Sequence, residues 1–240
     1  YREDVVLALD GAARAAGAPP VPVHIKVETG NNRQGLPPEE TLALAARIRG
    51  LSGVTLEGLT SHYADIEDTT DHSYARRQLA CFRDVAHALR DAGDPVPILH
   101  FSNSAAAMLW PETHFDMIRP GISLYGMWPS KETYVSALVH GVNPLDLRPA
   151  LTWKTRIAQI KDLGTGQSVG YGRSFRATHP MRLAVLPVGY YDGYDRSLGN
   201  RAEVLVGGDP APVRGRVCMN MIMIDVTHVR DAAPDQEVVL

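Results

Sequence analysis

The sequence predicts an α/β domain followed by an all-β domain, and we interpret the first as the carboxy-terminal part of a (β/α)8 TIM-like barrel. From residue 1 to about residue 134, short β-branched runs alternate with helical periodicity, a pattern typical of parallel strands joined by crossover helices. After residue 144, apolar runs alternate with Gly and Pro and no long helical pattern is present. We expect the boundary within residues 134–151 and assign the domains to residues 1–140 and 141–240.

Eight elements are predicted in the first domain: a helix at 4–16, a strand at 21–27, a helix at 38–48, a strand at 54–61, a helix at 71–92, a strand at 98–101, a helix at 104–110 and a strand at 117–119. Glu39 and Glu40 favour a helix start, because acidic side chains stabilise the first turn. Gly93 ends the longest helix. In the second domain, strands are predicted at 151–160, 181–187, 202–206 and 217–226.

Composition indicates a globular protein and excludes several classes. The net charge of -3 gives no electrostatic reason for binding nucleic acid or a membrane surface, and no run of about 18 apolar residues exists to cross a bilayer. The 2 cysteines, Cys81 and Cys218, form no metal-ligand pattern, so we expect no metal and a reducing, cytoplasmic compartment. Both ends fall inside patterned segments; we therefore expect a fragment, whose signal peptide, if one exists, lies upstream of Tyr1.

Polar residues follow the predicted parallel strands at their carboxyl ends, where barrel active sites are built. They are Lys26, Arg33, His62, Asn103, Ser104 and Arg119, and Gly121 and Ile122 follow Arg119 with backbone N–H groups. Taken singly, each of these residues could have a purely structural role, such as a hydrogen-bonded histidine or a surface arginine. We expect Ser104 to cap the helix that follows it in any case. Their shared position favours a site, and Lys26 in an apolar strand is costly without a partner. The Ser104 hydroxyl at a helix start, with the Gly121 and Ile122 amides, predicts a phosphate site.

Three glycine-rich motifs follow in the second domain, at residues 168–175, 188–194 and 215–220. In the first, Tyr171 stands between Gly170 and Gly172, which lets other groups approach the backbone and aims the phenol into a cavity. Alone, a Gly-Tyr-Gly segment is more often a turn with a surface tyrosine. The ordered series of all three motifs is far more specific.

These segments together resemble the alanine racemase family of pyridoxal phosphate (PLP) enzymes over essentially the whole chain. The strongest matches are His24–Arg33, Asn103–Ser104, Arg119–Gly126, Gly170–Gly172, Gly189–Gly193 and Gly215–Met219. The resemblance implies PLP-dependent interconversion of L-alanine and D-alanine, supplying D-alanine for peptidoglycan. It also implies a homodimer in which the β domain of one subunit completes the active site of the other.

The resemblance also assigns roles to residues. Ser104, Gly121 and Ile122 would hold the PLP phosphate, with Tyr190 and Asn103 nearby. Arg119 would face the pyridine nitrogen and Arg33 the ring oxygen, while Lys26 resembles a carbamylated lysine that pairs with Arg33. Tyr171 would be the acid–base group on one face of the α-carbon, supported by His62 linked to Arg119. Met219, Tyr190 and Arg33 would contact substrate, and Arg196 and Arg216 would line the entrance.

Two departures limit the resemblance. The family's Schiff-base lysine lies in a segment like Val-Lys-Ala-Asn-Ala-Tyr-Gly, which is absent here, as is its late phosphate-binding tyrosine; we therefore expect the 240 residues alone to be inactive. Asn220 stands where the family usually has aspartate. The alternatives are a broader racemase acting on serine or basic amino acids, a PLP decarboxylase, or a non-catalytic PLP-binding protein, although the last two lack the motifs after Leu151.

Overall fold

A computed structural model describes residues 1–94, 96–142 and 145–240, which form two compact units, Tyr1–Ala150 and Leu151–Leu240. This division falls inside the 134–151 interval, after the boundary assigned between residues 140 and 141. Residues 143 and 144, within that interval, lie outside the described residues, as does residue 95. Each unit has its own hydrophobic core.

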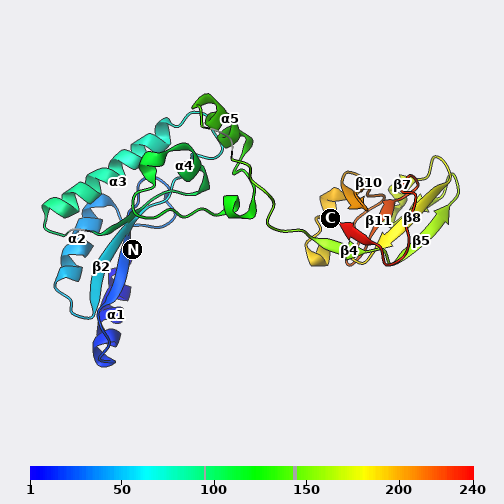
Figure 1. Cartoon of the computed structure of the whole chain (residues 1–240). Helices are drawn as coiled ribbons and strands as arrows, with labels where there is room; N and C mark the ends of the chain where they lie inside the picture. Colours follow the sequence, from blue (N-terminus) through cyan, green and yellow to red (C-terminus); the bar gives the residue numbers. More distant parts are fainter. Residues whose placement is uncertain (95, 143–144) are drawn as a thin grey trace. The chain divides into compact units, whose positions relative to one another are not determined.

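The amino-terminal unit begins with a repeated helix–strand pattern (Figure 1). Its first elements are α1 (Glu3–Ala15), β1 (Val21–Lys26), α2 (Pro38–Arg49), β2 (Val54–Thr60), α3 (Ser73–Asp91) and β3 (Ile98–His100). The strands form one parallel sheet in the order β1-β2-β3. Helix α2 packs against α3 and β2, and buried Phe82 of α3 meets Phe101 after β3. The predicted parallel α/β arrangement is confirmed.

The chain then continues through short elements: α4 (Ser104–Leu109), the 3-10 turns η1 (Pro111–Thr113) and η2 (Ile122–Tyr125), and α5 (Lys131–Val139), which the sequence pattern did not predict. The predicted strand at 117–119 is wrong. Asp116 N–H donates to Leu99 O at 3.1 Å and Arg119 N–H to Ser102 O at 3.0 Å, so the segment runs beside β3 without a continuous ladder. The helix cap is also different: Asn103 Oδ1, not Ser104, accepts from the N–H of Ala106 at 3.0 Å.

The carboxy-terminal unit is all-β, as predicted. Its strands are β4 (Lys154–Arg156), β5 (Gln159–Leu163), β6 (Ser168–Val169), β7 (Phe175–Arg176), β8 (Met181–Leu186), β9 (Glu203–Val206), β10 (Asp209–Pro212), β11 (Ile222–Asp225) and β12 (Glu237–Val239). Strands β10-β9-β12-β4 form one antiparallel sheet, β11-β8-β5 another, and β6-β7 a ribbon. The predicted strand at 151–160 is two strands in different sheets. The chain passes between the sheets here, because Ile157 N–H donates to Gln236 O at 3.0 Å and Ala158 N–H donates to Val185 O at 2.8 Å.

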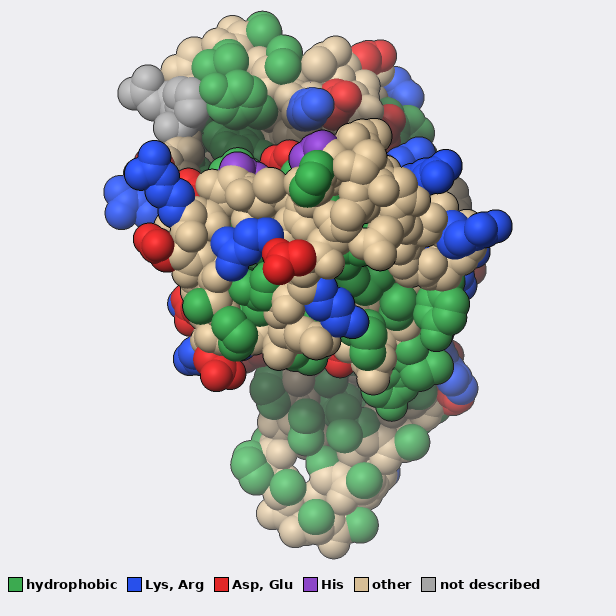
Figure 2. Space-filling model, turned by 90° about the vertical axis from the view of Figure 1, so that its right-hand side faces the viewer, with side chains coloured by type: hydrophobic (Ala, Val, Ile, Leu, Met, Phe, Trp, Pro, Cys, Tyr) green, Lys and Arg blue, Asp and Glu red, His purple; other side chains and the backbone are tan. Residues whose placement is uncertain are grey.

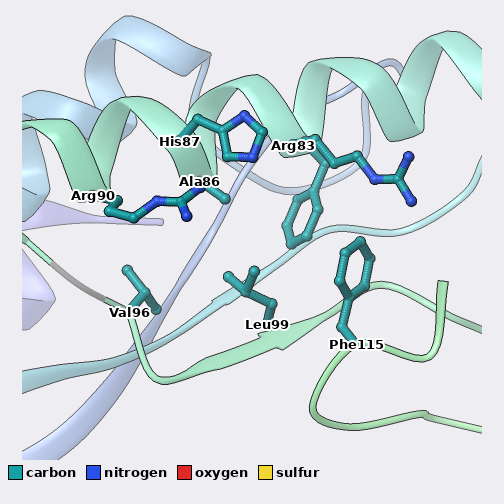
Figure 3. A pocket seen from close by; sticks show the side chains of 8 residues that line it. Arg83, Ala86, His87, Arg90, Val96, Leu99 and Phe115 are labelled. Atoms are coloured by element: carbon teal, nitrogen blue, oxygen red, sulfur yellow. The ribbon is translucent and has the colours of Figure 1, made fainter. Parts of the chain in front are cut away.

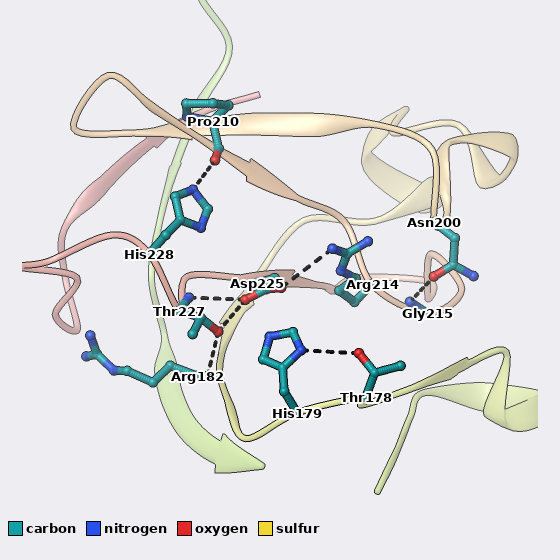
Figure 4. Close-up of polar contacts among 10 residues, drawn as sticks. All are labelled: Thr178, His179, Arg182, Asn200, Pro210, Arg214, Gly215, Asp225, Thr227 and His228. Atoms are coloured by element: carbon teal, nitrogen blue, oxygen red, sulfur yellow. Dashed lines mark hydrogen bonds and ion pairs between the residues drawn. The ribbon is translucent and has the colours of Figure 1, made fainter. Parts of the chain in front are cut away.

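A polar network inside this unit satisfies a buried carboxylate (Figure 4). Asp225 Oδ1 accepts from the N–H of Thr227 at 3.1 Å and from its hydroxyl at 2.6 Å, and Asp225 Oδ2 pairs with Arg214 at 3.5 Å. Thr227 Oγ1 in turn accepts from the N–H of Arg182 at 3.0 Å, which joins the end of β11 to the start of β8. Because a buried charge is costly unless paired, this network fixes the edge of the sheet.

The surface carries charges of both signs among apolar side chains on the face drawn in Figure 2. This agrees with the small net charge of -3. Among the described residues, the helices lack the combination of length and apolar composition that crossing a membrane demands.

Replacing a core side chain of the carboxy-terminal unit tests this packing. Ile224 on β11 is fully buried, so Ile224→Ala should lower the free energy of unfolding of this unit by about 2–5 kcal/mol through lost burial and a residual cavity. Leu205→Ala on β9, where the side chain is 43% exposed, is the control and should cost about 1 kcal/mol or less. Urea unfolding followed by circular dichroism measures both, and equal losses would contradict the assigned core.

Candidate functional site

The register of the parallel sheet gathers the predicted site residues of the amino-terminal unit at one edge. Lys26 at the end of β1 pairs with Thr60 at the end of β2, which pairs with His100 at the end of β3. The segments that follow these strands therefore start from the same edge. They carry His62 after β2 and Asn103–Ser104 after β3.

Arg119 is held at this edge by three acceptors. Its Nη1 donates to Nδ1 of His100, and its Nη2 donates to Ser61 O at 2.6 Å and Phe101 O at 3.5 Å. The arginine's imidazole partner is thus His100, where the resemblance implied His62. The register explains this, because His100 ends its strand in the Thr60 row, whereas His62 lies two residues beyond Thr60.

Both histidines at this edge are neutral near pH 7. Burial, together with the positive charges of Arg33, Arg119 and Lys26, lowers the pKa of His62 to about 4. Burial, together with the effects of Arg119 and His24, lowers the pKa of His100 to about 4 as well. The cationic groups of the edge are therefore the arginines and Lys26, while the imidazoles act as neutral hydrogen-bonding groups.

Lys26 is not fully buried, contrary to what its apolar neighbours suggest. Its Nζ donates to Gln34 Oε1 at 3.3 Å, and its side chain is partly exposed. Burial lowers the pKa of Lys26, as do the charges of Arg33 and Arg119, against an opposite effect from Glu28. Glu28 itself accepts from the N–H of Gly30 at 2.5 Å, which orders the loop that carries Arg33. Lys26 thus lies among cations that disfavour its charge.

Three donors converge on the hydroxyl oxygen of buried Ser104, which lies at the start of α4. They are the N–H of Gly121 at 2.8 Å, the N–H of Ser123 at 3.3 Å and the hydroxyl of Ser123 at 3.1 Å. A side chain at Gly121 would find no atom within 4 Å, so the space beside this backbone is open. Asn103 has a structural part here, because its Nδ2 donates to Glu67 Oε1 at 2.7 Å while its Oδ1 caps α4.

The three glycine-rich motifs meet within the carboxy-terminal unit. Tyr190 N–H donates to Cys218 O at 3.0 Å and Tyr191 N–H to Met219 O at 2.8 Å. A Cβ at Gly189 would lie 2.6 Å from the backbone nitrogen of Asn220, so only glycine allows this approach. Asn200 Oδ1 accepts from the N–H of Gly215 at 2.6 Å, which fixes the start of the third motif (Figure 4).

Tyr171 is presented to solvent by this cluster. The residue is 73% exposed, and it lies between two glycines of positive φ. A Cβ at Gly172 would lie 3.1 Å from Cζ of Arg216, so the guanidinium of Arg216 lies against the Gly-Tyr-Gly turn. Arg196 lies over the ring of Tyr190, at 5.3 Å from its centroid. A hollow of about 730 Å³ in this unit is lined by Lys161, Tyr171, Met219 and Asn220 among others.

A second hollow, between α3 and β3, lies away from these residues (Figure 3). It measures about 290 Å³ and has an apolar floor that includes Leu99 and Phe115, with Arg83, His87 and Arg90 of α3 above it. Because side chains alternate along a strand, Leu99 faces this groove while His100 faces the opposite side of the sheet. The groove is therefore separate from the edge that carries Arg119.

Sequence reasoning missed four polar residues: His100 and Glu67, which contact Arg119 and Asn103, and His24 and Glu57, which lie behind His100. His24 Nδ1 lies 2.7 Å from His100 Nε2, and His24 Nε2 lies 3.0 Å from Glu57 Oε2. The period of two offered a signal, because His24 shares a face of β1 with Lys26. Glu57 and Glu67 gave no signal, since their contacts depend on how separate segments meet.

Comparison with known proteins assigns both units to one family. Residues 1–129 match the model of the alanine racemase N-terminal domain, and residues 150–240 match that of the alanine racemase C-terminal domain. The chain is 44% identical over 218 residues to the alanine racemase of Halothermothrix orenii, covering 91% of this chain and 55% of that protein. It is 44% identical over 240 residues to that of Syntrophobacter fumaroxidans, covering 100% of this chain and 61% of that protein.

Solved structures agree. Alanine racemase from Clostridium difficile 630 matches with a TM-score of 0.88 and 31% identity, over 100% of this chain and 60% of that one. The enzyme from D-cycloserine producing Streptomyces lavendulae matches with a TM-score of 0.83 and 34% identity, over 98% and 60%. The chain therefore spans less than two thirds of these relatives, and the fold class predicted from the sequence is confirmed. From its amino-terminal barrel strands to its carboxy-terminal β unit, this chain belongs to the alanine racemase family.

Proposed function

We propose that the whole protein is a PLP-dependent alanine racemase that interconverts L-alanine and D-alanine and supplies D-alanine for peptidoglycan. Membership of the family and the combination of an anion-binding edge with the exposed phenol of Tyr171 support this activity. The observation that carries the proposal is the Gly-Tyr-Gly turn, which leaves Tyr171 73% exposed in its own unit. We place the enzyme in the cytoplasm, where the free thiols of Cys81 and Cys218 stay reduced.

The donors around Ser104 fit the phosphate of PLP. Three donors already point at one oxygen, and the open space beside Gly121 leaves room for a group with several acceptor oxygens. The Ser104 hydroxyl and the N–H groups of Gly121 and Ile122 would bind the phosphate as charge-assisted donors. Asn103 contributes by capping α4 and so holding Ser104 in place.

The opposite end of the cofactor ring fits the arginines. When bound, PLP supplies an electron-withdrawing ring that makes the α-hydrogen of the amino acid acidic. Arg119 is permanently charged and only donates, so it would hold the ring nitrogen as an unprotonated acceptor. Arg33 would contact the ring oxygen and the substrate carboxylate, with Met219 N–H and Tyr190 as further substrate contacts.

Racemisation requires an acid–base group on each face of the α-carbon. We assign one face to the Tyr171 phenol, with neutral His62 as a hydrogen-bonding group in its support. The second group is the lysine to which PLP attaches, in a segment that this chain does not contain. Lys26, Lys131, Lys154 and Lys161 are the lysines present.

Asn220 favours one alternative, a racemase that also accepts serine or basic amino acids. It lines the same hollow as Tyr171 and Met219, and it has the shape of aspartate without the charge. The side chain at this position of the hollow therefore carries no charge that would repel or attract a charged substrate side chain. The match to the alanine racemase C-terminal domain argues against a non-catalytic PLP-binding protein built from the barrel alone.

The whole protein, loaded with PLP, should convert L-alanine to D-alanine, and Tyr171→Phe should lower kcat by about 100-fold or more because one face loses its acid–base group. Tyr191→Phe, an 82% exposed tyrosine of the neighbouring motif, is the control and should retain activity. D-Alanine is measured by a coupled oxidase assay, with serine and lysine as competing substrates. A protein inert towards alanine, or a fully active Tyr171→Phe, would overturn the assignment.

Tyr171 should act on the barrel of a second subunit. An acid–base phenol needs a covering surface, and Tyr171 is 73% exposed in its own unit. Arg119→Ala and Tyr171→Phe proteins should each be nearly inactive, but a mixed dimer has one intact site. After subunit exchange of an equal mixture, activity should return to about one quarter of wild type. Exchange confirmed by mass spectrometry without recovered activity would show that Tyr171 acts within its own subunit.

Lys26 should react with carbon dioxide to form a carbamate. Its lowered pKa supplies the neutral amine that reacts, and the product anion would convert repulsion by Arg33 and Arg119 into attraction. In 13C-labelled bicarbonate, the protein should show a carbamate carbon resonance that Lys26→Ala removes. Lys161→Ala, at an exposed position of β5, is the control and should retain the signal. A wild-type spectrum without the resonance would refute the modification.

A further inference from the structure

A chain of hydrogen bonds runs from Arg119 through two histidines to Glu57. Arg119 Nη1 donates to His100 Nδ1, His100 Nε2 lies 2.7 Å from His24 Nδ1, and His24 Nε2 lies 3.0 Å from Glu57 Oε2. His100 is buried, whereas the side chains of His24 and Glu57 are 26% and 40% exposed. The proposed function uses Arg119 but assigns nothing to His24 or Glu57.

The residues at the two ends of this hydrogen-bond chain, Arg119 and Glu57, fix the direction in which every bond between them donates. A guanidinium only donates, so Nδ1 of His100 must be an acceptor. A neutral His100 then carries its proton on Nε2 and donates to Nδ1 of His24. His24 in turn carries its proton on Nε2 and donates to Glu57, whose carboxylate only accepts. Each ring therefore has a single tautomer that satisfies both of its neighbours.

The backbone of β2 is shaped to make this chain possible. Val23 pairs with Leu56 and His24 pairs with Gly58, so Glu57 is an extra residue in a bulge that brings it beside His24. A Cβ at Gly58 would lie 2.6 Å from Cγ of His24, so a side chain there would displace the ring. Without one, the His24 ring crosses β2 and reaches His100 on β3.

We propose that Glu57 and His24 are positioning residues that hold His100 in the tautomer whose Nδ1 accepts from Arg119. His100 and Ser61 O together accept hydrogen bonds from both terminal nitrogens of the guanidinium. Among residues 1–94, 96–142 and 145–240, Arg119 Nε makes no hydrogen bond, so its N–H remains for a ligand. The identification of this ligand as the ring nitrogen of PLP rests on the proposed function. The assignment of the histidine tautomers does not rest on it.

Loss of the Glu57 acceptor should be transmitted to Arg119. Without a carboxylate, the His24 proton is free to move to Nδ1, where it opposes the N–H of His100. His100 then relieves this contact by moving its proton to Nδ1, where it opposes the N–H of Arg119. The guanidinium would lose one of its acceptors and its fixed orientation, since two donors cannot bond to each other.

The tautomers can be read directly from solid-state 15N spectra of histidine-labelled, cofactor-free whole protein, because protonated and unprotonated ring nitrogens resonate far apart. Signals are assigned by their loss in His24→Asn and His100→Asn. We expect wild-type His24 and His100 each to be neutral, with the proton on Nε2. A proton on Nδ1 of either ring, or a charged ring, at pH 7 would overturn the proposal without requiring any variant to fold.

Variants at Glu57 then test the coupling. Glu57→Ala should produce mixed tautomers at both rings and lower kcat by about 10- to 100-fold, as expected for a misoriented contact. Glu57→Gln should restore the wild-type tautomers and most of kcat, because the amide oxygen can still accept from His24. Glu40→Ala, an exposed carboxylate of α2, is the control.

The outcomes separate the two proposals. Unchanged tautomers and kcat in Glu57→Ala would overturn the positioning role even if the protein is a racemase. Wild-type tautomers as expected, together with their loss in Glu57→Ala and rescue in Glu57→Gln, would support the positioning role even if the whole protein failed to racemise alanine. In that case only the identity of the Arg119 ligand would have to change.

Discussion

The need of a partly buried guanidinium for acceptors organises the edge of the barrel unit. Arg119 lies on a segment after β3, yet its hydrogen bonds go to Ser61 after β2 and to His100 at the end of β3. A buried charge costs several kcal/mol unless it is paired or hydrogen-bonded, so these acceptors must stay in place. The same bonds tie together the segments that follow β2 and β3, next to His62 and a few residues from Ser104.

In the carboxy-terminal unit, the equivalent constraint is close backbone contact. The second and third motifs share hydrogen bonds from Tyr190 and Tyr191 to Cys218 and Met219, and Gly189 is the residue that admits them. Because of these contacts, the two motifs form one surface although they are far apart in the sequence. Arg216, against Gly172, links the first motif to them. The phenol of Tyr171 is therefore placed by backbone geometry rather than by burial of its ring.

The sequence predicted what local patterns encode and missed what depends on tertiary contact. Periodicity located the parallel strands and the long α3 helix, and glycine spacing located the Tyr171 turn. The prediction of a strand at 117–119 was wrong because the backbone of residues 116–119 makes only isolated hydrogen bonds, to Leu99 and Ser102, and no continuous ladder. The partner of Arg119 could not be predicted, because it depends on the register that places His100 level with Thr60. The contacts of His24 with Glu57 and His100 depend in turn on the bulge at Glu57 and on the absence of a side chain at Gly58.

Charge balance at the barrel edge explains which ligands suit it. Lys26, Arg33 and Arg119 influence one another closely enough that the last two lower the pKa of Lys26, and His62 and His100 are kept neutral among them. Glu28 is engaged by the N–H of Gly30, and Glu57 receives the far end of the histidine chain. Positive charge at the edge thus exceeds what nearby carboxylates neutralise. Phosphate and carboxylate groups, which accept bonds from such donors, are the ligands that relieve this excess.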